Sequence, residues 1–171
     1  MGYCGQMLRS STIPSAWPRR DSIPTYGSGI DLFLDSDALL NQVEGFLAQG
    51  HKAVKIKIGR DNAEEDLDRI AAVKKLIGPK RRLFVDANQR WNVADCMIRL
   101  QKLAAFDLGW VEEPLHAEDI RGHADLRRIA ALPIALGESL YTRHQLLTIY
   151  RPTPSTSSKR TSAGSGELAS G

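Results

Sequence analysis

The feature that most constrains this chain is a strand-and-helix pattern that repeats at a nearly constant interval. Three short apolar runs each end in an acid, and these acids, Asp86, Glu112 and Glu138, are 26 residues apart. A fourth apolar run at residues 53–59 precedes them, and segments with helical periodicity lie between the runs. This repeat is typical of a (β/α) barrel, in which the C-terminal ends of the strands converge on one site. The pattern therefore predicts the α/β class and a TIM-like barrel.

The chain is short for a complete barrel of this kind. It has 171 residues, whereas a complete barrel has about 250. Residues 19–150 hold about five strand–helix units, beginning with a run at residues 23–30, so we expect a partial barrel. Because parallel strands are normally buried on both faces, we expect open edges, low stability, and weak or absent activity unless the chain assembles with another.

Apolar periodicity predicts which side of each helix is buried. Ser36 is a suitable N-cap for the first helix. The expected core positions are Leu39, Leu40, Val43, Phe46 and Leu47 in the first helix, Leu67, Ile70, Ala71 and Ile77 in the second, and Val93, Met97, Leu100 and Ala104 in the third. Cys96 lies within the third apolar pattern, and we expect it to be a buried thiol in a reducing compartment.

The two ends of the chain differ from the middle. Residues 1–18 form an irregular head without helical or strand periodicity, and residues 151–171 are rich in Ser, Thr, Gly and Pro. The net charge of +3 belongs to these ends, because the head carries +1, the tail carries +2 and the middle is neutral. The basic residues are few and not interleaved with aromatic ones, so a nucleic-acid-binding module is the weakest interpretation. We also find neither a membrane span nor an export signal, and expect a cytoplasmic protein.

Two interpretations of the ends remain open. The simpler one is that the tail is disordered. The other is that both ends are out-of-frame translations. Read one base earlier, the codons of the tail permit an apolar strand that ends in an acid at the position of Thr161, which would continue the barrel repeat.

The three acids predict a metal site. Carboxylate oxygens suit hard divalent cations such as Mg²⁺ or Mn²⁺ rather than zinc or copper. A single acid at a strand end could be a salt-bridge partner, but three at equal spacing favour a shared cation. Because strand side chains alternate between faces, Glu112 should point toward the site and Glu113 away from it.

Lys55 and Lys57 share one face of the strand that precedes the acids. Two ammonium groups inside a barrel are costly unless they lie beside anions, so we expect them next to the acids. A lysine crowded by a second cation and a metal ion has a lowered pKa and can remove a proton at neutral pH. The alternative is a pair of solvated lysines on an edge strand. Asn88 shares the face of Asp86 and could bind substrate or make a structural hydrogen bond.

Four motifs resemble the mandelate racemase and muconate-lactonizing branch of the enolase superfamily, over residues 19–150. They are Lys55-Ile56-Lys57, Val85-Asp86-Ala87-Asn88, Val111-Glu112-Glu113-Pro114 and Gly137-Glu138-Ser139. The resemblance implies a modified (β/α)₇β barrel and a separate capping domain, and we expect the capping domain to be missing from this chain. Full-length relatives are expected to be homo-oligomers.

The resemblance also implies roles. Asp86, Glu112 and Glu138 would bind Mg²⁺, with Mn²⁺ as the alternative. The metal would hold the carboxylate of a small hydroxy acid or acid sugar and stabilise the enediolate formed on loss of the α-proton. Lys57 would be the base, assisted by Lys55, and Asn88 would contact substrate. Some members pair a later-strand His with an acid on the sixth strand, which corresponds to the re-read position of Thr161.

Two functional hypotheses follow from the resemblance. The first is an enzyme that abstracts a proton next to a carboxylate, as a racemase, dehydratase or cycloisomerase does. The second is a non-catalytic fragment of such an enzyme, produced by a frame-disrupted gene. Within the first hypothesis, the sequence does not separate the three reaction types.

Overall fold

The computed structural model describes residues 23–150. It contains one sheet of five parallel strands, in which the spatial order follows the chain order. The strands are β1 (Gly27–Ser28), β2 (Ala53–Lys57), β3 (Arg82–Asp86), β4 (Val111–Glu112) and β5 (Ile134–Ala135). The irregular head, the tail and the re-read position of Thr161 lie outside the described residues.

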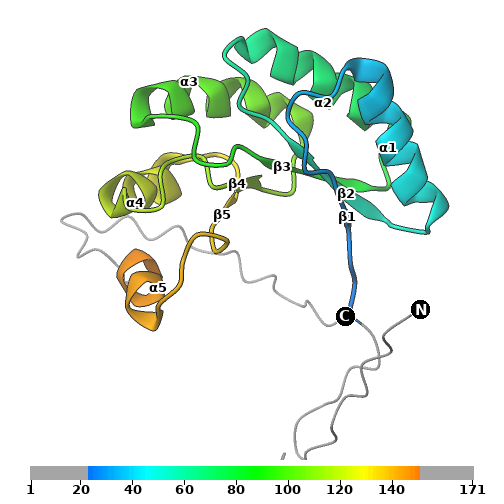
Figure 1. The fold of residues 1–171 in the computed structure, drawn as a ribbon. Coiled ribbons are helices and arrows are strands. Elements are labelled where there is room, and N and C mark those ends of the chain that lie inside the picture. The colour runs from blue at the N-terminus through cyan, green and yellow to red at the C-terminus, as the bar shows by residue number, and fades with distance from the viewer. Residues whose placement is uncertain (1–22, 151–171) are drawn as a thin grey trace, which may run out of the picture.

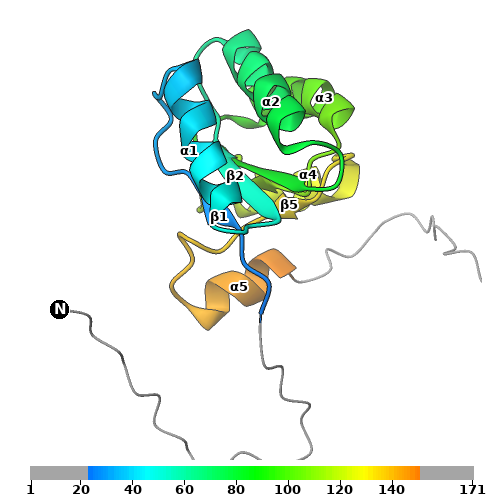
Figure 2. The same ribbon diagram turned by 90° about the vertical axis from the view of Figure 1, so that its right-hand side faces the viewer.

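Helices connect the strands and lie around the outside of the sheet (Figures 1 and 2). They are α1 (Ser36–Ala48), α2 (Ala63–Ile77), α3 (Val93–Leu103), a 3₁₀ turn η1 (Ala104–Phe106), α4 (Ile120–Ile129) and α5 (Arg143–Tyr150). Each α-helix contacts the next one along the chain. Parallel strands in chain order with helices outside form part of a barrel, which confirms the predicted fold class.

An Asp or Asn side chain begins each of the first four helices by accepting a hydrogen bond from a first-turn backbone N–H. Asp35, Asn62, Asn92 and Asp119 are these caps, with donor–acceptor distances of 2.8 to 3.1 Å. The cap of α1 is therefore Asp35 and not Ser36, which is the first helical residue. A carboxylate accepts this bond more strongly than a hydroxyl, because it is charged and meets the positive end of the helix dipole.

The main core lies between the sheet and the helices. Val54 and Ile56 of β2 and Leu83 and Val85 of β3 point toward the helices and are fully buried. The helices contribute a set of buried apolar side chains, namely Leu39 and Val43 of α1, Ile70, Val73 and Ile77 of α2, and Cys96, Leu100 and Leu103 of α3. Cys96 is thus the expected buried thiol, and burial raises its pKa to about 12.

Two expected helix faces were partly wrong. In α2, Val73 is buried and Ala71 is exposed. In α3, Val93 is exposed, whereas Cys96 and Leu103 occupy the buried row, and Ala104 lies in η1 and is also exposed. Small apolar residues are tolerated at exposed positions, so they define the phase of a helix less well than Leu or Ile does.

The first strand is shorter than expected. Of residues 23–30, only Gly27 and Ser28 pair with β2, and Ile23 and Ile30 are 76% and 82% exposed. Pro24 has no N–H to donate to a sheet, which limits pairing at this edge.

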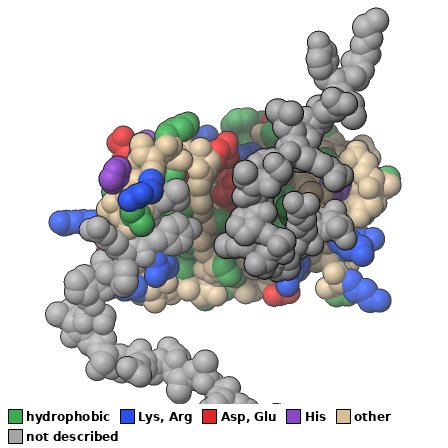
Figure 3. All heavy atoms as spheres, turned by 90° about the horizontal axis from the view of Figure 1, so that it is seen from below, with side chains coloured by type: hydrophobic (Ala, Val, Ile, Leu, Met, Phe, Trp, Pro, Cys, Tyr) green, Lys and Arg blue, Asp and Glu red, His purple; other side chains and the backbone are tan. Residues whose placement is uncertain are grey.

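Figure 3 views the molecule from below, and lysine and arginine side chains project at both sides of that view. Within residues 23–150, none of the helices combines the length and the apolar character needed to cross a membrane.

Candidate metal centre

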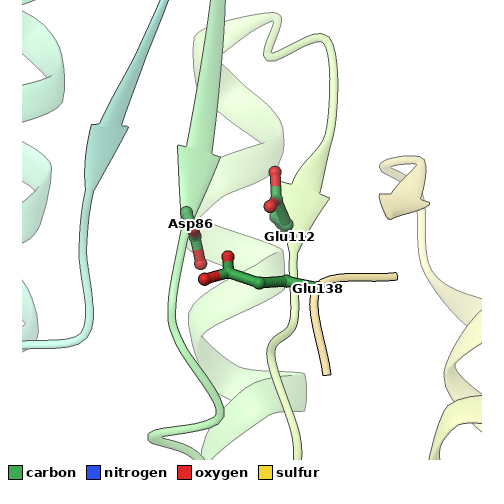
Figure 4. Close-up of side chains that lie close together, drawn as sticks. All are labelled: Asp86, Glu112 and Glu138. Atoms are coloured by element: carbon green, nitrogen blue, oxygen red, sulfur yellow. The ribbon is translucent and has the colours of Figure 1, made fainter. Parts of the chain in front are cut away.

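The three evenly spaced acids come together at the C-terminal ends of the strands (Figure 4). One carboxylate oxygen from each of Asp86, Glu112 and Glu138 lies within 4.8 Å of the other two. Asp86 and Glu112 are partners in the register between β3 and β4, so both side chains leave the sheet on the same face. The strand repeat therefore brings together side chains that are far apart in sequence.

The three acids differ in burial and in the element that carries them. Asp86 is fully buried, Glu112 is half-buried and Glu138 is exposed. Glu138 does not end a strand as expected, because β5 stops at Ala135 and Glu138 follows in the next loop. Glu138 reaches the other two acids from that loop (Figure 4).

Both lysines of β2 pair with these acids. Lys55 Nζ donates to the two carboxylate oxygens of Glu112 at 2.8 and 2.9 Å and lies 3.3 Å from Asp86 Oδ2. Lys57 Nζ donates to Asp86 Oδ2 at 2.7 Å. Because β2 lies between β1 and β3 and Lys55 is only 6% exposed, the solvated edge-strand alternative is wrong.

The neighbouring acids determine the charge balance of Lys55. Burial lowers the pKa of Lys55, but the hydrogen bond and negative charge of Glu112, together with the charge of Asp86, outweigh it and leave the pKa raised. These acids therefore favour the charged form of Lys55, and the lowered lysine pKa expected beside a bound metal ion stays a prediction.

The donor set fits a hard divalent cation. All three groups offer carboxylate oxygen, which Mg²⁺ and Mn²⁺ prefer. One carboxylate oxygen of each acid lies within 4.8 Å of the other two, so small side-chain movements would bring all three into contact with one cation. Three carboxylates and two ammonium groups also leave one net negative charge to attract a cation.

Asn88 contributes to the site through its backbone. Its N–H donates to Asp86 Oδ1 at 2.9 Å, and its φ of 44° lies in the left-handed region that Asn tolerates. The side chain is exposed. The structural hydrogen bond considered for Asn88 is thus made, but by the main chain.

A cluster of aromatic side chains packs next to the acids. The rings of Phe84 and Trp110 stack with centroids 3.6 Å apart, and Tyr26 meets both edge-on. Trp110 Nε1 donates to Glu112 Oε2 at 3.2 Å. Sequence reasoning missed this contact, although Trp110 stands two residues before Glu112 and alternation places both on one face.

Sequence reasoning also missed the hydrogen bonds of Glu113. Glu113 points away from the acid cluster, as expected, but it is 2% exposed and accepts hydrogen bonds from Gln89 and Ser139. The available signal was the adjacent pair of glutamates at a strand end. Only one of them can face the site, and a buried carboxylate needs donors on the other side.

Comparison with known proteins identifies relatives of this arrangement. A family model described as Enolase C-terminal domain-like matches residues 38–151. The chain is 42% identical over 120 residues to the 3,6-anhydro-alpha-L-galactonate cycloisomerase of Streptomyces coelicolor. The matched region covers 70% of this chain and 33% of that protein. The chain thus spans about a third of the length of the curated relatives it matches.

Solved structures share the fold. A racemase from Streptomyces coelicolor A3(2), crystallised with bound magnesium, matches with a TM-score of 0.72 and 39% identity, over 74% of this chain and 36% of that one. An L-talarate dehydratase from Polaromonas sp. JS666, complexed with Mg and L-glucarate, matches with a TM-score of 0.71 and 34% identity, over the same shares of the two chains.

Proposed function

This chain belongs to the enolase C-terminal domain-like family, and on that premise we propose that it supports Mg²⁺-dependent removal of a proton next to a carboxylate group. The observation that carries the proposal is the convergence of three acids and two lysines at the C-terminal end of the sheet. The proposed step is common to racemases, dehydratases and cycloisomerases, the three kinds of enzyme among the relatives.

Asp86, Glu112 and Glu138 would hold the cation. Bound there, Mg²⁺ supplies a positive centre that binds the substrate carboxylate and stabilises the negative charge that develops as the α-proton leaves. Mn²⁺ would serve the same purpose, since it takes the same oxygen ligands.

The lysines would have separate roles. Lys57, in its neutral amine form, would accept the proton at Nζ, because it reaches the site from β2 beside Asp86. Lys55 is held charged by Glu112 and Asp86 and would stabilise developing negative charge without losing its own proton. Asn88, exposed beside Asp86, would contact the substrate. The substrate would be a small hydroxy acid or acid sugar, the class to which L-glucarate belongs.

Proton exchange tests the proposal. The 171-residue chain is incubated in deuterated water with Mg²⁺ and L-glucarate, and loss of the α-proton signal is followed by NMR. We expect exchange in the wild type, none with Lys57→Ala, and wild-type exchange with Lys52→Ala, since Lys52 is exposed at the opposite end of β2.

The same experiment separates the enzyme from a non-catalytic fragment. The observation that favours a fragment is that the chain spans only about a third of the relatives. Saturable Mg²⁺ binding without any exchange would support the fragment, and exchange that survives Lys57→Ala would contradict the assignment of Lys57 as base.

A further inference from the structure

Glu113 is a buried acid that the proposed chemistry does not use. It follows Glu112 directly after β4, and its carboxylate contacts Gln89 and Ser139 rather than the three acids of the cluster. Its backbone has a φ of 39°, which is uncommon for a residue other than glycine. A buried carboxylate in an unusual backbone conformation is costly unless specific partners compensate for it.

Hydrogen bonds from two neighbouring loops satisfy this carboxylate. Glu113 Oε1 accepts from the backbone N–H of Ser139 at 2.9 Å, and Oε2 accepts from Ser139 Oγ and from Gln89 Nε2, both at 3.1 Å. Gln89 Nε2 also donates to Ser139 Oγ at 2.7 Å. Gln89 follows β3 and Ser139 follows β5, so one side chain links the ends of three strands.

The orientation of Gln89 is fixed by its other end. Gln89 Oε1 accepts from the backbone N–H of Ala117 at 2.9 Å. An N–H can only donate, so the amide oxygen must face Ala117 and the amide nitrogen must face Glu113. Glu113 therefore meets a defined donor.

Ser139 is the residue directly after Glu138. Within residues 23–150, the Glu138 carboxylate has neither a hydrogen-bond donor nor an ion-pair partner, and it is exposed. Asp86 and Glu112, in contrast, are held by lysines. A turn bond from Leu140 N–H to the Gly137 carbonyl spans Glu138, and the bonds from Ser139 to Glu113 tie this turn to the end of β4.

We propose that Glu113, with Gln89, is a positioning residue that holds Glu138 in place for cation binding. This inference rests on the proposed function, because it assigns Glu138 to the cation. Groups that orient metal ligands typically change metal affinity by about 10- to 100-fold when they are removed. The expected effect at Glu113 is therefore a loss of affinity, although Glu113 does not itself face the cation.

A reciprocal exchange of the two side chains gives a sharp test. In Glu113→Gln, two amide nitrogens compete for the same contacts, and in Gln89→Glu, two carboxylates face each other. In the double variant Q89E/E113Q, Glu at position 89 accepts from Ala117, from the new Gln amide and from Ser139 Oγ, while the Gln oxygen accepts from the Ser139 N–H. The bonds from the Ala117 and Ser139 N–H groups keep their direction, and the bonds among the side chains of residues 89, 113 and 139 are restored with their direction reversed.

The experiment measures Mn²⁺ affinity of the 171-residue chain by electron paramagnetic resonance, with water-proton relaxation of the complex as a second readout. We expect E113Q to weaken Mn²⁺ binding about tenfold or more and the double exchange to recover most of that loss. In an E138Q background, E113Q should cause no further loss, since its effect acts through Glu138. The water-proton relaxation rate of the Mn²⁺ complex should rise in E113Q as it does in E138Q, because a water molecule replaces the Glu138 carboxylate on the ion in both variants.

Urea unfolding without metal separates positioning from stability. If the losses from E113Q and E138Q are additive, or if the exchange restores stability but not affinity, Glu113 is only a structural residue and the inference is overturned. If the wild type binds no Mn²⁺ at all, the proposed metal function fails first and the positioning role fails with it.

Discussion

At the residue scale, Glu112 is the acid of the cluster whose side chain accepts the most hydrogen bonds among the described residues. It accepts two hydrogen bonds from Lys55 and one from Trp110. One of its carboxylate oxygens also lies within 4.8 Å of an oxygen of Asp86 and of Glu138. These donors fix the orientation of the carboxylate before any cation arrives, which lowers the cost of ordering it on binding.

The first prediction concerns this residue. Glu112→Gln removes one negative charge and one strong oxygen donor, so Mg²⁺ affinity should fall by about tenfold or more. Competition of Mg²⁺ with bound Mn²⁺ measures the change, and Glu118→Gln, an exposed acid further along the chain, is the matched control. Equal affinity in the two variants would remove Glu112 from the site.

His123 supports a prediction about acid stability. Burial lowers the pKa of His123, and this outweighs the opposing effects of the Asp119 carbonyl, the Asp119 charge and the Glu113 charge. Below about pH 6.5, the folded state therefore binds a proton at His123 less readily than the unfolded chain does. Since the unfolded state binds more protons there, stability falls as the pH drops below about 6.5, by at most about 1.4 kcal/mol per pH unit.

Urea midpoints measured between pH 7.5 and 5 would detect this loss. His123→Gln should reduce the slope of stability against pH, whereas His116→Gln, on an exposed side chain, should leave it unchanged. A wild-type slope that survives His123→Gln would assign the effect to other groups.

At the scale of elements, the helices begin where Asp and Asn side chains cap them. Asn92 Oδ1 accepts from the backbone N–H of Asp95 at 2.9 Å, and the helix that follows buries Cys96, Leu100 and Leu103. Asn92→Ala should therefore lower the free energy of unfolding by about 1 kcal/mol, and Asn92→Asp should retain most of it. Chemical denaturation checks both, and equal stability of the Ala and Asp variants would argue against the cap.

Alternation and repetition explain what the sequence could predict at this scale. In β2 and β3, side chains alternate strictly, so the placement of Lys55, Lys57 and Asp86 on one face followed from the residue order. The parallel register then placed Glu112 beside Asp86.

Other features depend on contacts that the residue order does not encode. The phase of α3 depends on packing against α2 and the sheet, and Val93 and Ala104 are compatible with either side. Glu138 reaches the cluster from a loop, and the link between Glu113, Gln89 and Ser139 joins three loops. The pKa of Lys55 depends on which charges are nearest, and these are acids at 2.8 and 3.3 Å.

At the scale of the whole molecule, the sheet has a well-paired centre and weakly paired edges. Strands β2 and β3 pair over five residues, whereas β1, β4 and β5 contribute two residues each. Within residues 23–150, the outer sides of β1 and β5 have no partner strand.

This arrangement predicts uneven local stability. Backbone amides of β2 and β3 should exchange with deuterium slowest, and those of β1 and β5 fastest, because local opening needs less free energy where fewer contacts are lost. Hydrogen exchange followed by mass spectrometry would show the order. Uniform protection across the sheet would mean that the edges are covered, for example by assembly with another chain.

The most direct test of the central claim is calorimetric titration of the 171-residue chain with Mg²⁺, comparing the wild type with Glu138→Gln. Glu138 is exposed, so this substitution changes the acid cluster with little effect on the core. We predict saturable binding of one ion in the wild type and clearly weaker binding in the variant. Absence of saturable binding in the folded wild type, or equal binding in both proteins, would contradict the proposal that these three acids form a cation site.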